Sequence, residues 1–145
     1  MAGIELISRA VIRREDKVLL AHKLGEVNTF LPGGHIEEGE YAEEALRREL
    51  REELGVESRI LGFIGILEHK FADEDGRKHE EINLIFEAEI EDSRAESAEG
   101  HLEFKWIKPA DFTDNVLLPS SLSMLLKKWL KDGKPFHYAQ RDYYR

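Results

Sequence analysis

The segment YAEEALRRELREEL, residues 41–54, places acidic side chains on what should be the apolar face of a helix. At about 100° per residue, its alanines and leucines gather on one face that must cover the rest of the fold: Ala42, Ala45, Leu46, Leu50 and Leu54. Glu49 and Glu53 fall inside this apolar arc and Glu52 falls at its edge, whereas Arg48 falls on the opposite, solvated side.

Two carboxylates one turn apart on a partly buried face repel each other and lose solvation unless a cation joins them. The chain contains no cysteine, so no thiolate is available to bind a softer metal. Carboxylate oxygens favour a hard divalent cation. The helix over 41–54 is therefore predicted to carry a metal ion.

The other patterns predict strands and a second helix. Apolar-rich or alternating runs predict strands at 5–14, 17–22, 59–71, 81–90 and 101–107. A short strand is expected within 29–34, where it ends in a Pro-Gly-Gly break. Leucines and Trp129 at helical spacing predict an amphipathic helix over 120–132, ended by Gly133. This order indicates one α/β domain over residues 1–145, with helices covering a mixed sheet.

Composition limits the kinds of partner. The 145 residues carry 30 acidic against 21 basic side chains, a net charge of -9, which argues against a general nucleic-acid binder. A small phosphorylated ligand brought in with a metal ion remains compatible with that charge. No amino-terminal apolar run resembles a signal peptide or membrane span, so a cytoplasmic protein without membrane contact is expected.

The residues from Gly34 to Val56, GHIEEGEYAEEALRRELREELGV, have a spacing that is more specific than their composition. The segment resembles the nudix box with every fixed position occupied: Gly34, Glu40, Arg48, Glu49, Leu50, Glu52, Glu53, Gly55 and Val56. The strands and the carboxy-terminal helix around it also stand where such a domain has them. The resemblance implies a nudix-type α/β/α sandwich, in which helices flank a mixed β-sheet.

The same resemblance implies a metal-dependent hydrolase. The family uses Mg2+ or Mn2+ to cut a phosphoanhydride bond in a nucleoside diphosphate linked to another group. Glu49 and Glu53 would be metal ligands, Glu52 would be a ligand or would orient or deprotonate water, and the Gly34 carbonyl would complete the coordination. Arg48 would pair with an acid and hold the cluster in shape. The substrate stays open among nucleotides, nucleotide sugars, ADP-ribose and dinucleoside polyphosphates.

An acid outside the box is expected to complete the site. By strand alternation Leu102, Phe104 and Trp106 share the core face of 101–107, so Glu103 points away from it. Glu99 stands in the preceding loop, from which a carboxylate can be delivered to a metal site. Its position resembles that of an extra glutamate that some nudix enzymes supply, and we favour Glu99 over Glu103.

Two other functions are weighed against hydrolysis of a small nucleotide derivative. A non-catalytic nucleotide-binding regulatory module would be expected to lack a box glutamate, and this chain lacks none. An RNA 5'-end pyrophosphohydrolase would need a basic groove, which the net charge disfavours. The tyrosine-rich tail over 134–145 is expected to pack on the domain or on a second subunit, as in a homodimer. Phe30 and Phe71 could stack on a base, although core packing is the commoner role of an aromatic side chain.

Overall fold

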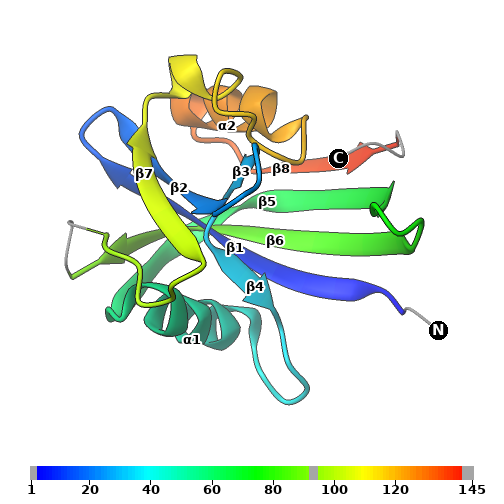
Figure 1. Ribbon diagram of the computed structural model, residues 1–145. Helices are drawn as coiled ribbons and strands as arrows, with labels where there is room; N and C mark the ends of the chain where they lie inside the picture. The colour runs from blue at the N-terminus through cyan, green and yellow to red at the C-terminus, as the bar shows by residue number, and fades with distance from the viewer. Residues whose placement is uncertain (1–2, 92–94, 142–145) are drawn as a thin grey trace.

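A computed structural model describes residues 3–91 and 95–141 of the chain and shows a mixed β-sheet with a helix on each face (Figure 1). The elements follow in the order β1 (Glu5–Arg14), β2 (Lys17–Lys23), β3 (Thr29–Phe30), β4 (Gly33–His35), α1 (Ala42–Leu54), β5 (Ser58–Ala72), β6 (Lys78–Ile90), β7 (Leu102–Ile107), the 3-10 turn η1 (Pro109–Asp111), α2 (Leu122–Asp132) and β8 (Phe136–Gln140).

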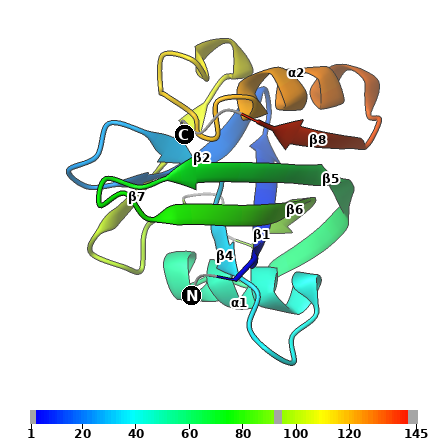
Figure 2. The same cartoon turned by 90° about the vertical axis from the view of Figure 1, so that its right-hand side faces the viewer.

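Strand β1 joins the two parts of the sheet, whose main order is β3-β2-β1-β6-β5-β8. One edge of β1 runs parallel to β6 from Glu5 opposite Glu81 to Ile12 opposite Ala88. The other edge pairs with β4 at residues 7–9 and with β2 at residues 13–14. Strand β7 then extends the sheet from β2. Strands β5 and β6 form a long antiparallel hairpin that lies beside β1, as Figure 2 shows.

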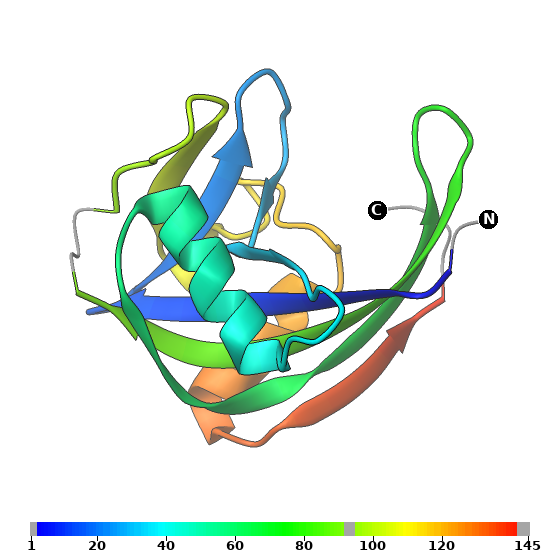
Figure 3. The same cartoon turned by 90° about the horizontal axis from the view of Figure 1, so that it is seen from below.

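Residues that alternate along the strands supply two separate cores. On one face, leucines of α1 pack with Ala10, Leu19 and Phe86 of the sheet. On the other face, leucines and Trp129 of α2 pack with Val11 and Leu20. Successive residues of a strand point to opposite faces, so each strand contributes to both layers. Figure 3 shows α1 lying across the strands on one side, and the predicted α/β/α arrangement is confirmed.

Most of the predicted elements are found within a few residues of their expected bounds. Helix α1 ends at Gly55, whose φ of 67° is the left-handed conformation that glycine adopts without strain. The expected Pro-Gly-Gly break is only partly correct, because Gly33–His35 continues as strand β4 along β1. Among the described residues, neither helix has the length and apolar character that crossing a bilayer requires.

The sequence did not predict strand β8. Residues 136–140 run parallel to β5, with Phe136 opposite Gly65 and Gln140 opposite His69. The segment is short and lacks a period-two apolar pattern, so its strand conformation depends on partners supplied by β5. The expected packing of the tail on the domain is thus seen for 136–140, whereas Tyr143 and Tyr144 lie outside the described residues.

We predict that Gly65→Ala loosens β8. A methyl group at Gly65 would lie 2.6 Å from the Phe136 carbonyl oxygen, whereas one at Gly62 of the same strand meets nothing within 4 Å. Overpacking of this kind typically costs about 1–3 kcal/mol. Hydrogen exchange and thermal unfolding should show faster exchange at 136–140 and a lower Tm for Gly65→Ala than for Gly62→Ala. Equal effects of the two substitutions would contradict this account of β8.

Candidate active site

The three acids that the sequence placed on or near the apolar face of α1 differ strongly in exposure. Glu53 is only 6% exposed, the Glu49 side chain 17% and the Glu52 side chain 53%. This order follows their positions on the helix, from the centre of the apolar arc to its edge. Glu53 Oε2 accepts a hydrogen bond from the Gly33 amide at 3.3 Å, which ties α1 to β4.

Arg48 connects the acids of α1 to the preceding loop. Its Nε and Nη2 donate to the two Glu40 oxygens at 2.8 and 2.9 Å, and Nη1 donates to Glu49 Oε1 at 3.0 Å. Nη1 also lies 3.4 Å from Glu52, and Nη2 donates to the His35 carbonyl oxygen at 3.0 Å. Arg48 starts from the solvated side of the helical wheel, but its long side chain folds back over β4 and is 21% exposed. Its pairing with acids is what the resemblance implied.

The same contacts set the charge states around Arg48. Its hydrogen bonds lower the pKa of Glu40 to about 2, and the Glu37 backbone amide contributes in the same direction. The pKa of Arg48 is raised, mainly by Glu40 and also by Glu49. A fork of two parallel hydrogen bonds to a carboxylate fixes orientation as well as charge. Glu40 therefore supports Arg48, and Arg48 fixes one oxygen of Glu49.

Glu53 has the opposite electrostatic environment. Burial raises its pKa to about 8; the negative charges of Glu49 and Glu99 add to this, while the positive charge of Arg9 and the Gly33 hydrogen bond oppose it. A buried carboxyl group with carboxylates around it is the arrangement that an added cation would stabilise in the ionised form.

The glycines before α1 bring the backbone close to these acids. At Gly33, with φ of 139°, a side chain would collide with the Ser8 carbonyl, and at Gly34 it would collide with the Glu49 carboxylate. The donors gathered here are carboxylate and carbonyl oxygens, which fit a hard divalent ion. In the described part of the chain, no three histidine or acidic side chains already converge as a metal-binding group. Among these oxygens, Glu49 Oε1 accepts a hydrogen bond from Arg48.

The loop before β7 is anchored to the end of α1. The Ala98 amide donates to the Glu53 carbonyl oxygen at 2.7 Å, and the charge of Glu99 contributes to the raised pKa of Glu53. The Glu99 side chain is 33% exposed and lies 3.3 Å from His101 Nε2. The Glu99 loop is thus joined to the end of α1, and the charge of Glu99 reaches Glu53.

Glu103 lies in a different environment. Its Oε1 is 2.7 Å from His22 Nδ1 and 3.4 Å from Lys105 Nζ, and the His22 contact is the main cause of its lowered pKa. The predicted orientation away from the core face is confirmed. Glu103 belongs to a polar cross-strand cluster on β2 and β7.

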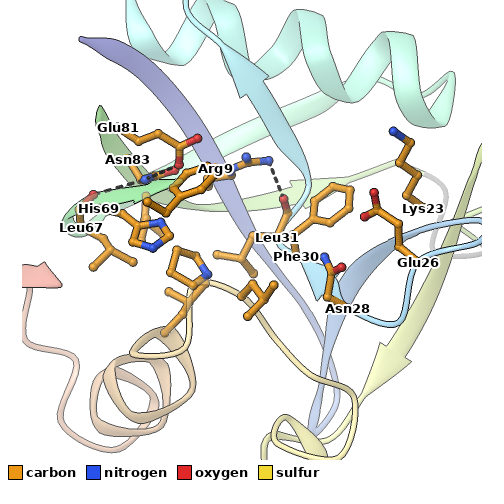
Figure 4. A pocket seen from close by; sticks show the side chains of 15 residues that line it. Arg9, Lys23, Glu26, Asn28, Phe30, Leu31, Leu67, His69, Glu81 and Asn83 are labelled. Atoms are coloured by element: carbon orange, nitrogen blue, oxygen red, sulfur yellow. Dashed lines mark hydrogen bonds between the residues drawn. The ribbon is translucent and has the colours of Figure 1, made fainter. Parts of the chain in front are cut away.

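The structure also contains a cavity of about 350 Å³ (Figure 4). Its lining comes from β1, the β2–β4 segment, the β5–β6 hairpin and the start of α2: Arg9, Lys23, Glu26, Asn28, Phe30, Leu31, Leu67, His69, Phe71, Glu81, Asn83, Ile85, Leu118, Pro119 and Leu122. Arg9 connects the cavity to α1, because it lines the cavity and its charge also reaches Glu53. Arg9 Nη1 donates to the Leu31 carbonyl oxygen at 3.1 Å, and its guanidinium lies 5.7 Å from the Phe30 ring centre.

Several residues of this cavity were not singled out from the sequence. Arg9 interrupts the apolar run ISRAVI, and Asn83 interrupts INLIF. A polar residue inside an apolar strand is the signal that could have pointed to them. Which long-range partners they meet depends on the parallel pairing of β1 with β6, which local periodicity does not reveal.

Comparison with known proteins agrees with the box. A family model described as NUDIX domain matches residues 6–131, and the chain therefore belongs to the NUDIX domain family. Proteins named nucleoside triphosphatase NudI, from Escherichia coli O139:H28 and from Shigella flexneri, are 40% identical to it over 90 residues. That match covers 56% of this chain and 62% of theirs, so the chain spans about three-fifths of the length of these relatives.

Solved structures show the same fold. The MutT protein of Bacillus halodurans superposes with a TM-score of 0.72 at 23% identity, covering 97% of this chain and 93% of that one. An ADP-ribose pyrophosphatase from Streptococcus suis gives a TM-score of 0.69 at 16% identity, covering 94% and 98%. At these identities the likeness supports the fold of the chain.

We predict that Glu53 lowers the free energy of unfolding of the metal-free protein, and that this effect depends on pH. Its pKa is raised on folding from 4.5 to about 8, so the folded state holds a proton that the unfolded chain releases. The free energy of unfolding therefore falls as pH rises from about 4.5 to 8. In chelator, Glu53→Gln should raise the Tm by roughly 5 °C or more at pH 8 and much less at pH 5. Glu52→Gln is the control, since Glu52 is exposed; the same pH trend in both variants would exclude Glu53 as the cause.

Proposed function

We propose that this chain is a metal-dependent hydrolase that cleaves a phosphoanhydride bond in a nucleoside phosphate derivative. The observation that carries the proposal is the buried carboxyl group of Glu53, which is influenced by the charge of Arg9, a residue that also lines a cavity of about 350 Å³. The family membership and the names of the relatives support the same chemistry. A nucleoside triphosphatase and an ADP-ribose pyrophosphatase both act on phosphoanhydride bonds.

The proposed ligands of the metal are Glu49, Glu52, Glu53 and the Gly34 carbonyl oxygen. When bound, Mg2+ or Mn2+ would neutralise charge on the phosphate oxygens and favour ionisation of an attacking water. Glu53 fits this role because its buried carboxylate needs a positive partner to be ionised at neutral pH. Glu49 fits because Arg48 contacts only its Oε1, which leaves Oε2 for the cation.

The chain's own residues have separate tasks in this proposal. Arg48 positions Glu49 and Glu52 through its Glu40-anchored guanidinium. Arg9, which lines the cavity and whose charge reaches Glu53, offers a cationic group to a phosphate oxygen. Glu52 and Glu99 are the candidate proton acceptors for water, since both are near the site and reach solvent.

The test is a substrate screen with Mg2+ and with Mn2+, using nucleoside triphosphates, ADP-ribose, nucleotide sugars and dinucleoside polyphosphates. Turnover in oxygen-18 water should place the label on a phosphate product, because water attacks phosphorus. Label on a sugar carbon would contradict the proposed bond cleavage. A folded protein that hydrolyses none of these compounds with either metal would instead be a binding module.

We predict that Glu53→Gln lowers kcat by roughly 10²-fold or more, about 3 kcal/mol in barrier, because a metal ligand is lost. Glu43→Gln is the matched control, since Glu43 is an exposed acid on the first turn of the same helix. Chelation should abolish turnover while circular dichroism stays unchanged, because the two cores form from apolar residues alone. Full turnover by Glu53→Gln would remove Glu53 from the site.

We further predict that Glu99→Gln lowers kcat and Glu103→Gln does not. Glu99 lies within electrostatic range of Glu53, whereas Glu103 is held by His22 and Lys105. A fall of roughly tenfold or more is expected if Glu99 contributes as a ligand or base. The measurement is kcat on the best substrate from the screen. A loss in Glu103→Gln alone would transfer the role to Glu103.

A further inference from the structure

We propose that Glu81 and Asn83 select the base of the substrate, and that they favour a base with two adjacent hydrogen-bond donors on one edge, as guanine has. The inference rests on the proposed function, because it assigns the cavity to the base of a nucleotide. It names two specificity-determining residues on β6, outside the nudix box.

Strand alternation places these two residues in the cavity. Glu81, Asn83 and Ile85 line it, while the intervening Leu84 and the neighbouring Phe86 pack against α1. Figure 4 shows Glu81 and Asn83 together at one end of the cavity, with Lys23 at the other. A base that contacts Glu81 and Asn83 therefore lies at the opposite end of the cavity from Lys23.

The hydrogen bonds of Asn83 fix which way its amide points. Asn83 is only 3% exposed, and its Nδ2 donates to the Leu67 carbonyl oxygen at 3.3 Å and to Glu81 Oε1 at 3.4 Å. Both partners can only accept, so the nitrogen must face them and the oxygen must face elsewhere. No donor within residues 3–91 or 95–141 contacts Asn83 Oδ1. This oxygen is also not one of the fully buried side-chain atoms that lack a hydrogen-bond partner. Asn83 therefore presents an acceptor to the cavity.

Glu81 presents further acceptors beside it. Within the described ranges its carboxylate contacts the Asn83 amide and forms no ion pair with a lysine, arginine or histidine. Leu67 and Ile85 supply apolar wall to the same cavity, and Arg9 and His69 supply polar wall. A buried acceptor left without a donor costs about 1–3 kcal/mol, and more when it is charged. A ligand that fills this end of the cavity must therefore bring hydrogen-bond donors.

The common bases differ in how they meet this requirement. Guanine carries a ring N–H next to an exocyclic amino group, so one edge can donate to Glu81 and Asn83 together. Adenine and cytosine place a ring acceptor beside their amino group, and uracil and thymine place their single N–H between two carbonyl oxygens. Each of these would set an acceptor against the Glu81 carboxylate. A site built around hydrogen bonds rejects such mismatches much more strongly than an apolar pocket does.

The aromatic side chains of the cavity suggest how the base is stacked. Phe71 has His69 and His79 stacked on it, each with ring centres 4.8 Å away. Phe30 has Arg9 near one face at 5.7 Å and lines the middle of the cavity. We assign the stacking surface to Phe30, which lies next to Arg9, the cavity residue whose charge also reaches Glu53.

The test compares guanine with hypoxanthine, which lacks only the exocyclic amino group. Binding of GMP and IMP to the metal-free protein is measured by calorimetry, and kcat/KM is measured for GTP and ITP with Mg2+. We expect the wild type to favour the guanine compound at least tenfold in both measurements. In Glu81→Gln and in Asn83→Leu this ratio should fall toward one. Glu80→Gln is the matched control, because Glu80 is the next residue of β6 and lies on the surface near Lys70.

Each outcome has a separate meaning. A wild type that binds GMP and IMP equally, or a guanine preference that survives in Glu81→Gln, overturns this inference. Hydrolysis without base preference removes the inference and leaves the proposed function intact. A preference for GMP over IMP that is lost in Glu81→Gln, without turnover of any nucleotide, supports the inference and rejects the hydrolase. Thermal unfolding of each variant establishes that a lost ratio does not reflect a lost fold, and Glu81→Gln serves if Asn83→Leu fails to fold.

Discussion

The arrangement of this site depends on one unfavourable burial, that of the Glu53 carboxyl group between α1 and the glycines of β4. An isolated carboxylate is costly to remove from water, so the position favours either a proton or a cation. The neighbouring residues allow both states of Glu53. The Gly33 backbone amide donates a hydrogen bond to the Glu53 carboxyl group. Arg48 donates to the neighbouring Glu49, so the acids stay close without a rigid ion pair at Glu53.

Local periodicity in the sequence was sufficient to predict the two helices and the position of the acids on α1. The apolar arc of α1 predicted the burial of Glu53, and the spacing of the box predicted the family. The helical wheel alone did not show the acid pairing of Arg48, because a wheel records where Cα lies and a long side chain can fold back over a neighbouring strand. Glu99 was favoured from its place in a loop, and a backbone hydrogen bond at Ala98 joins that loop to the end of α1.

Long-range pairing accounts for what the sequence did not show. Strand β8 forms because β5 offers it an edge, and the cavity forms because β1 pairs with β6 on one side and diverges from β2 and β4 on the other. Arg9 and Asn83 are ordinary polar interruptions in their own segments. They become neighbours of one cavity only through register, which no window of ten residues contains.

The alternation of β6 separates two tasks that evolution can then change independently. One face of the strand is fixed by packing against α1, the helix that carries the acids, whereas the other face lines the cavity. Substitutions at the cavity positions alter which molecule fits without disturbing the spacing of the acids on the helix. A gene duplication of such a domain could therefore diverge in selectivity through a few strand positions while the hydrolytic apparatus is inherited intact.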